Sequence, residues 1–192
     1  MRVTRLRERS RSRVEVELDG APWRVLPADA VVRCGLRLGR ELDRETARAL
    51  ARELRRSRAL ERAARVLAVG DRSRHELGER LAKAKVTRAA REEAIDALER
   101  AGLVDEERLA CRRAAALALR GYGDAAIRAD LARRVLPADA ITGALAGLPP
   151  EHERIRELLR SERPTRQQMR RLAARGFSRE TLDDLAAFAP EP

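Results

Sequence analysis

A three-helix pattern that recurs with a period of about 46 residues is the feature that most constrains what this chain can fold into. The first helix of each copy is expected to start near Ser57, Asp105 and Glu151. The second helices open at Ser73, Gly123 and Thr165, and the third helices follow at Thr87, Pro137 and Ser178. Small helical units of this kind bury their apolar faces against their neighbours. We therefore predict a mainly α-helical fold with three tandem three-helix repeats.

Helix start and stop signals support these repeats. Ser73-Arg-His-Glu76 and Thr165-Arg-Gln-Gln168 are capping boxes, in which the hydroxyl and the Glu or Gln side chain satisfy backbone N–H groups at a helix start. Matching apolar positions follow in the three second helices: Leu77 and Leu81, Ile127 and Leu131, Met169 and Leu172. Gly102 suits a helix end and Asp105 suits the next helix start. The third helix of repeat 1 is expected to carry about one extra turn.

The predicted organisation has five segments. They are a β-rich extension at 1–42, a connecting helix at 43–56, and repeats at 57–104, 105–150 and 151–189. Only 2% of the residues are aromatic, so alanine, leucine and valine must supply most of the core. We expect the repeats to form an elongated, curved array whose concave surface binds something extended.

The N-terminal extension is predicted to contain a β-hairpin. Residues 13–18 alternate charged and apolar side chains, which is the period of a half-buried strand, and Asp19-Gly20 is a strong hairpin turn signal. The register set by this turn pairs Leu18 with Ala21, Val16 with Trp23, Glu15 with Arg24 and Val14 with Val25. Pro22 cannot donate to a ladder, so its strand should be an edge strand or be bulged there. Residues 36–42 are interpreted as one further short strand.

Positive charge is concentrated near the start of the chain. The formal net charge is +11, and residues 1–70 hold 18 basic and 10 acidic residues. A basic surface attracts nucleic acid, an acidic protein face or anionic lipid. Alternate arginines would form one row on a strand: Arg5, Arg7, Arg9, Arg11 and Arg13. Two interpretations stay open, either a ridge of phosphate contacts or an exposed face that Glu15 and Glu17 partly neutralise.

The chain carries no residue pattern typical of catalysis, so we do not expect an enzyme. It has no CxxC or HExxH zinc pattern and no glycine loop for phosphates, so no metal and no cofactor are expected. Cys34 and Cys111 give no disulfide framework, and no apolar run is long enough to cross a membrane. These features favour a cytoplasmic protein without a membrane partner. Four aromatic residues are also too few for a protein that stacks the bases of a single strand.

Four motifs, in their order and spacing, resemble those of the RecX family of bacterial RecA regulators. They are Arg72-Ser-Arg-His-Glu-Leu77, Ala101-Gly-Leu-Val-Asp-Glu-Glu-Arg-Leu-Ala110, Arg120-Gly-Tyr-Gly123 and Arg171-Leu-Ala-Ala-Arg-Gly-Phe-Ser178. Three features depart from the family pattern. Leu109 replaces the usual aromatic residue, Leu136-Pro137 replaces a more typical Gly-Ile/Val-Ser/Asp, and the third-repeat core position Met169 is shifted. Both replacements keep apolar or helix-starting chemistry, so the same fold is still expected.

The resemblance implies a non-enzymatic modulator, specifically an inhibitor, of the RecA recombinase in DNA repair, DNA recombination and the SOS response. Members of the family lie in the groove of the RecA–DNA filament and bridge adjacent protomers. They restrain its ATPase activity, extension and strand exchange, and some also bind DNA directly. The implied partners are therefore the RecA filament and single- or double-stranded DNA, bound mainly through phosphates, with this chain as a monomer. The alternative is a basic nucleic-acid-binding protein that acts on DNA without RecA.

Exposed side chains at helix starts and junctions are the predicted partner contacts. The candidates are Arg72, Arg74, Arg112, Arg113, Arg120, Tyr122, Arg133, Arg134, Arg170, Arg171 and Arg175. Each arginine has a competing interpretation, in which its stem covers neighbouring apolar surface. For Tyr122 the alternatives are a ring presented to a partner and a ring that packs at a helix junction.

Overall fold

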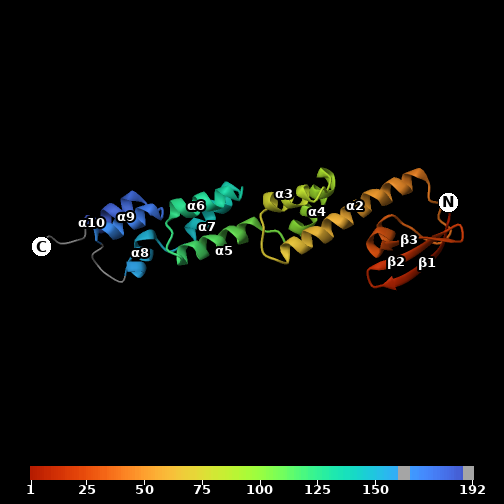
Figure 1. Cartoon of the computed structure of the whole chain (residues 1–192), viewed down its shortest axis with the longest axis horizontal. Helices are drawn as coiled ribbons and strands as arrows, with labels where there is room; N and C mark the ends of the chain where they lie inside the picture. Colours follow the sequence, from red (N-terminus) through yellow and green to blue (C-terminus); the bar gives the residue numbers. More distant parts are fainter. Residues whose placement is uncertain (160–164, 188–192) are drawn as a thin grey trace. The chain divides into compact units, whose positions relative to one another are not determined.

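The chain folds into two compact units, each described by itself. The computed structural model describes residues 1–159 and 165–187. Unit 1 comprises Met1–Gly70 and Leu77–Leu103, and unit 2 comprises Asp71–Glu76 and the chain from Val104 onward. Strands occur at the start of the chain, and the other regular elements of the described residues are helices (Figure 1). The prediction of a mainly α-helical chain with a small N-terminal β unit is confirmed.

Unit 1 begins with a three-stranded antiparallel sheet in the order β1-β2-β3. The strands are β1 (Val3–Ser10), β2 (Arg13–Leu18) and β3 (Ala21–Pro27). The predicted hairpin turn is confirmed, because Asp19 and Gly20 join β2 to β3 with φ values of 50° and 82°. Positive φ at both central residues is what a two-residue hairpin turn of type I′ requires, and aspartate and glycine tolerate it.

The predicted register of this hairpin is correct only next to the turn. Leu18 pairs with Ala21 as predicted, but the extra residue Trp23 in β3 shifts the later pairs by one residue. The predicted pairs Val16–Trp23, Glu15–Arg24 and Val14–Val25 are therefore wrong, and the observed pairs are Val16–Arg24, Glu15–Val25 and Val14–Leu26. The bulge follows Pro22, which has no N–H for the ladder, and it lets Leu26 enter the core.

Two further parts of the N-terminal segment differ from the prediction. The helix α1 (Ala28–Arg33) follows β3 directly and has no counterpart among the predicted elements. The predicted strand at 36–42 is wrong, because within the described chain this segment forms one isolated bridge, between Arg2 and Glu41. Left-handed glycines at 35 and 39 turn the backbone there. The core under the sheet comprises Val3, Val16, Leu18, Leu26, Ala30, Val31, Leu36 and Leu50.

The longest helix of unit 1, α2 (Arg44–Leu67), is continuous over 24 residues. Asp43 caps it as predicted, since its carboxylate accepts a hydrogen bond from the Thr46 N–H at 2.7 Å. The boundary predicted at Ser57, between the connecting helix and repeat 1, does not coincide with any break in this helix. The helix α3 (Arg74–Lys83) follows, and then α4 (Arg88–Arg100). A cluster of buried alanines, Ala59 from α2 with Ala90 and Ala94 from α4, forms the contact between these two helices.

Repeats 2 and 3 lie in unit 2. Their helices are α5 (Glu106–Leu119), α6 (Asp124–Arg133), α7 (Ala138–Ala146), α8 (Glu151–Leu159), α9 (Arg166–Ala174) and α10 (Arg179–Ala187). The predicted starts of these six helices are confirmed, and the capping boxes at Ser73 and Thr165 are both formed. The extra turn of repeat 1 is confirmed too, because α4 has 13 residues against nine in α7 and nine in α10.

Two further points concern the extent of the helices. The predicted end of repeat 3, at residue 189, lies outside the described residues. Within the ranges 1–159 and 165–187, none of the helices is both long enough and apolar enough to span a membrane.

Two apolar clusters hold unit 2 together. One is centred on Ile127 and Leu131 of repeat 2, and the other comprises Ile155, Leu172, Phe177 and Leu182 of repeat 3.

The same turn joins the second helix to the third in every repeat. One residue in each turn is left-handed: Lys85, Val135 and Gly176, with φ values of 58°, 57° and 81°. The next residue along donates its N–H to the carbonyl five residues earlier, at Leu81, Leu131 and Leu172. This is the Schellman arrangement that closes a helix, and glycine is its usual left-handed residue. Only the third repeat supplies glycine, so the other two turns carry backbone strain at Lys85 and Val135.

Replacing Val135 with glycine is expected to stabilise unit 2. A left-handed backbone costs a residue with a Cβ about 1–2 kcal/mol, and Val135 is β-branched and 55% exposed, so its side chain contributes little packing. Glycine also gives the unfolded chain more conformational entropy, which cancels part of this gain in the free energy of unfolding. We expect the free energy of unfolding to rise by about 1 kcal/mol, measured by urea denaturation followed by far-UV circular dichroism.

The matched control is Val69→Gly. Val69 is also an exposed valine in a turn, but its φ is not positive, so glycine relieves no strain there. This variant should be neutral or less stable than the parent protein. A stabilisation of the same size in both variants would show that the effect does not come from the left-handed turn.

Candidate interaction surface

A buried carboxylate holds the start of α8. Glu151 is 8% exposed, and its two oxygens accept hydrogen bonds from the N–H of Asp124 at 2.6 Å and of Ser178 at 2.8 Å. These N–H groups lie at the starts of α6 and α10, so one side chain connects three helices. Burial raises the pKa of the Glu151 carboxyl, but the two hydrogen bonds and the positive charge of Arg154 outweigh burial, and the pKa is lowered. The carboxyl is therefore ionised at neutral pH.

Arg154, one turn further along α8, is a buried structural residue that the sequence predictions did not include. Its side chain is 6% exposed. The guanidinium donates to the carbonyls of Pro149 at 2.9 Å and Tyr122 at 3.0 Å, and it pairs with the carboxylate of Asp124. It also lies over the Phe177 ring, 5.8 Å from the ring centroid. A buried arginine with this many partners fixes the loop before α6 against repeat 3.

The Gly-Tyr-Gly motif of repeat 2 contacts the Arg-Gly-Phe-Ser motif of repeat 3 through the backbone. The Gly123 N–H donates to the Arg175 carbonyl at 2.9 Å, and the Ala125 N–H donates to the Gly176 carbonyl at 3.1 Å. A Cβ added to Gly123 would overlap backbone atoms of Gly176. A Cβ added to Gly176 would lie 2.7 Å from the Cβ of Ala126. Glycine at both positions lets the two turns approach to hydrogen-bonding distance.

The start of α3 makes a similar set of contacts with repeat 2, inside unit 2. Glu106 is the first residue of α5 and accepts a hydrogen bond from the Arg74 N–H at 3.0 Å. Glu151, the first residue of α8, accepts the equivalent bond from the Asp124 N–H. Pro137, at the start of α7, has no N–H to offer a second bond of this kind. The Ser73 hydroxyl instead donates to the Arg134 carbonyl at 2.8 Å.

Four of the predicted partner contacts form ion pairs within unit 2, and three of them lie around Asp130. Arg113 makes a bidentate hydrogen bond to Asp130, at 2.9 and 3.1 Å, and Arg133 reaches the same carboxylate at 3.1 Å. The hydrogen bonds from Arg113 hold the pKa of the Asp130 carboxyl below its ordinary value. Arg134 pairs with Glu76 at 2.7 Å. Arg113 and Arg134 therefore bridge helices of this chain, whereas Arg133 pairs with a residue of its own helix and stays exposed.

Three other candidates lie near the start of α3 or on α5. Arg112 is exposed, and its guanidinium pairs with the Asp71 carboxylate at 2.6 Å. Arg72 is half-buried and donates to the backbone carbonyl of Asp71 at 2.8 Å. Arg74 is also half-buried, and its backbone N–H is the donor to Glu106. The Arg72 guanidinium is not joined to a carboxylate in the described part of the chain.

The remaining candidates lie around the junction of repeats 2 and 3. Tyr122 is half-buried and packs on the core of repeat 2, with the Arg120 guanidinium 5.5 Å from its ring centroid. The packed alternative for this ring is therefore the arrangement found. Arg170 and Arg171 on α9, and Arg175 directly after it, are exposed. Within residues 1–159 and 165–187, none of these three arginines forms an ion pair with a carboxylate.

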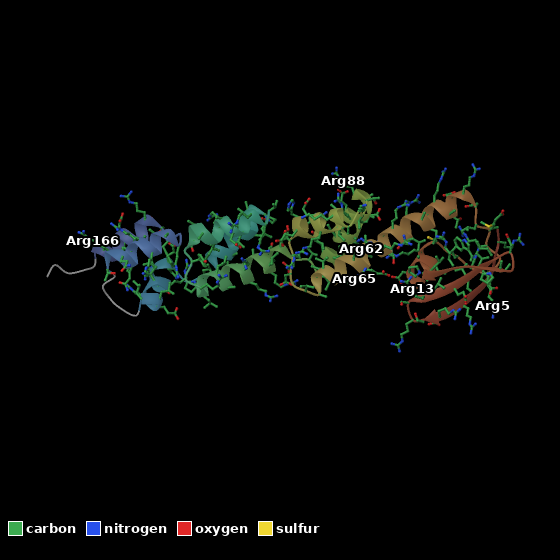
Figure 2. The ribbon with its side chains drawn as sticks, viewed as in Figure 1. Arg5, Arg13, Arg62, Arg65, Arg88 and Arg166 are labelled. Atoms are coloured by element: carbon green, nitrogen blue, oxygen red, sulfur yellow. The ribbon has the colours of Figure 1, made fainter. Side chains whose placement is uncertain are left out.

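The alternating arginines of the N-terminus do not share one strand. Arg5, Arg7 and Arg9 lie on β1, Arg11 lies in the following turn, and Arg13 begins β2. Figure 2 shows Arg5 and Arg13 on the sheet. Arg5 pairs with Glu17 at 3.5 Å and Arg9 pairs with Glu15 at 3.1 Å. These two pairs agree with an exposed face that Glu15 and Glu17 partly neutralise, and phosphate contacts by these arginines stay a prediction.

The chemistry on these surfaces is that of the guanidinium group. Guanidinium groups recognise carboxylates and phosphates through paired hydrogen bonds. Among the residues that the structure describes, no group of three or more His, Cys, Asp or Glu side chains could hold a metal ion. Cys34 and Cys111 are free thiols, and burial raises the pKa of the Cys34 thiol.

Comparison with known proteins gives matches in structure. No family model matches the chain, and no curated protein matches it. A solved structure of regulatory protein RecX is similar at a TM-score of 0.84 and 19% sequence identity, and the match covers 97% of this chain and 98% of that one. A structure of RecX from Lactobacillus salivarius is similar at a TM-score of 0.61 and 18% identity, over 69% of this chain and 95% of that one. The chain therefore has the fold of these RecX structures, and coverage of 97% must include the N-terminal sheet.

Proposed function

We propose that this protein regulates a RecA recombinase by binding in the groove of the RecA–DNA filament, where it inhibits ATPase activity, filament extension and strand exchange. The observation that carries the proposal is the likeness in fold to a RecX structure over 97% of the chain. Regulation of this kind needs binding alone, so we infer that the protein is not an enzyme. A filament on DNA as the partner implies action in the cytoplasm during DNA repair and recombination.

The positions of the motifs support this proposal. Two of the four motifs that resemble the RecX family meet at the junction of repeats 2 and 3, where Gly123 and Gly176 bring two turns together. A third motif begins at the capping box of α3, where Ser73 binds the backbone of Arg134. The motif residues therefore fix successive helices of unit 2 against each other. A fixed spacing of exposed arginines suits a partner that repeats along a filament.

The structure narrows the set of arginines that we propose as partner contacts. Arg113 and Arg134 bridge helices, and their removal would damage the fold of unit 2. The side chains that remain for a partner form no ion pair with a carboxylate within the described chain: Arg72, Arg120, Arg170, Arg171 and Arg175. We propose Arg170 and Arg171, on the exposed face of α9, as the principal pair.

The test is the ATPase activity of RecA on single-stranded DNA while this protein is titrated in. We expect the rate to fall as the protein is added. The variant Arg170→Glu/Arg171→Glu should need about tenfold more protein for the same inhibition, because reversed charges at an interface weaken association. Far-UV circular dichroism should show an unchanged fold for this variant.

The matched control is Arg128→Glu/Arg156→Glu. It makes the same change in net charge at two exposed arginines of α6 and α8 that form no ion pair in the described residues. This variant should inhibit like the parent protein. An unchanged ATPase rate at several-fold excess of the parent protein would refute the proposed function, and equal weakening in both variants would refute the assignment to α9.

A further inference from the structure

A groove in unit 1 is lined by cations and contains no acidic side chain. It lies between α2 and the turn that joins α3 to α4, with a volume of about 190 Å³. Its lining residues are Arg55, Arg58, Ala59, Arg62, Ala84, Lys85, Val86, Thr87 and Ala90. This groove was not among the sequence predictions, because it combines one face of α2 with a turn about 25 residues further along the chain.

Helix periodicity places three of these cations in a row. Arg55, Arg58 and Arg62 are spaced by three and four residues, so they share one face of α2 and extend over about 10 Å. Ala59 lies between them at 0% exposure, packed against Ala90 of α4. The floor of the groove is therefore made of small side chains and its rim of guanidinium groups. Figure 2 shows Arg62 on α2, where this row lies.

The charges of the groove are not neutralised by the chain itself. Within the described residues, no carboxylate forms an ion pair with Arg55, Arg58 or Lys85. Arg62 donates to the backbone carbonyl of Ala84 at 2.8 Å, which fixes its guanidinium at the α3–α4 turn without cancelling its charge. Some exposed arginines elsewhere in unit 1 do have carboxylate partners: Arg88 pairs with Glu92 at 2.7 Å and Arg13 with Glu61 at 3.3 Å.

We propose that this groove binds the phosphate backbone of double-stranded DNA. Four cations around one groove create a local positive potential, which a bound polyanion would neutralise. Guanidinium groups match phosphate geometry, and a duplex offers one negative charge per about 1.7 Å of its axis. The groove has no aromatic lining residue on which an unpaired base could stack, so a duplex suits it better than a single strand.

The lining also argues against a protein partner. Protein interfaces of useful affinity rely on aromatic or large apolar anchors in desolvated pockets. The apolar lining here is Ala59, Ala84, Ala90 and Val86, which offers no pocket for such an anchor. Binding through phosphates is independent of base sequence. The proposal concerns unit 1 and DNA alone, so it goes beyond regulation of the recombinase and does not depend on it.

The experiment is fluorescence anisotropy of a short labelled DNA duplex, with no recombinase present, from low to physiological salt. The variant is Arg55→Glu/Arg58→Glu, which spares the structural hydrogen bond of Arg62. We expect the affinity at low salt to fall about tenfold. The slope of log affinity against log salt should decrease in size by about 2, because the variant leaves two phosphates without their arginine.

The control is Arg44→Glu/Arg48→Glu on the same helix. Both residues are exposed, outside the groove and without an ion pair in the described ranges, so the change in net charge is identical. This control should keep most of the affinity and the slope. Thermal melts of both variants verify that the fold is intact.

Three outcomes would overturn the proposal. One is equal weakening in the groove variant and the control, which would mean that bulk charge binds the DNA. The second is tighter binding of a single strand of the same length than of the duplex. The third is unchanged duplex binding by the groove variant, which would mean that Arg55 and Arg58 do not contact the duplex. None of these depends on whether the parent protein inhibits RecA.

Discussion

Replacing Gly123 with alanine is expected to destabilise unit 2 by about 3 kcal/mol or more. Gly123 has an ordinary φ of −82°, so its requirement for glycine is spatial. A Cβ there would overlap backbone atoms of Gly176 and Phe177, which belong to a turn and cannot rotate away as a side chain could. The clash also pulls apart the hydrogen bond from the Gly123 N–H to the Arg175 carbonyl.

Two spectroscopic signals separate this effect from general damage. Far-UV circular dichroism reports helices of both units, whereas the fluorescence of Trp23, the one tryptophan of the sequence, reports unit 1. Urea denaturation of Gly123→Ala should lower the midpoint of the dichroism transition and leave that of Trp23 unchanged. The control Gly143→Ala lies within α7 with nothing within 4 Å of the added Cβ, and it should stabilise unit 2 by about 1 kcal/mol. Equal effects of the two alanines would contradict the close approach of the two turns.

Replacing Glu151 with alanine is expected to cost about 3 kcal/mol or more, because it removes one partner of a buried ion pair. The substitution leaves the N–H groups of Asp124 and Ser178 without their acceptor, and it leaves Arg154 with one carboxylate fewer. The same urea experiment measures the destabilisation. The control is Glu153→Ala on the same helix, since Glu153 is exposed and its removal should be nearly neutral.

The dependence on pH follows from the lowered pKa of Glu151. A carboxyl whose pKa is lower in the folded state contributes its full stability above its ordinary pKa of about 4.3. That contribution is lost as the pH falls through the lower pKa of the folded protein. The parent protein should therefore lose stability in mild acid more steeply than Glu151→Gln, whose side chain does not titrate. Parallel pH curves for the two proteins would show that Glu151 is not the titrating group.

The parts of the fold that the sequence predicts are those set by short-range chemistry. A capping box needs only the residues at Ser73 and Glu76, so its spacing is readable from the sequence, and the structure forms it. The same holds for Asp19-Gly20, whose backbone preference is local. The hairpin register is not local in this sense. The register depends on whether Leu26 or Val25 fills the core beneath the sheet. That core also contains residues of β1 and α1, which lie outside the hairpin.

The candidate site was less predictable because its contacts join distant parts of the chain. Arg113 is 17 residues from Asp130, and Arg134 is 58 residues from Glu76, so no spacing rule reveals these pairs. They account for predicted partner residues that turn out to bridge helices. Arg154 was not among the predicted contacts, because a charged residue three positions after Glu151 resembles a solvent-facing helix pair. Its burial becomes evident only when repeat 3 is packed against the loop before α6.

The left-handed turn after each second helix bears on how such proteins diverge. Its backbone is the same in three repeats, while the residue that adopts it changes from lysine to valine to glycine. Packing on both sides therefore dictates the geometry, and the strain at Val135 is tolerated because the surrounding helices hold it. Substitutions can accumulate at such a position without altering the path of the chain. Likeness in three dimensions can thus persist after the matching residues have been replaced, as 19% identity at a TM-score of 0.84 illustrates.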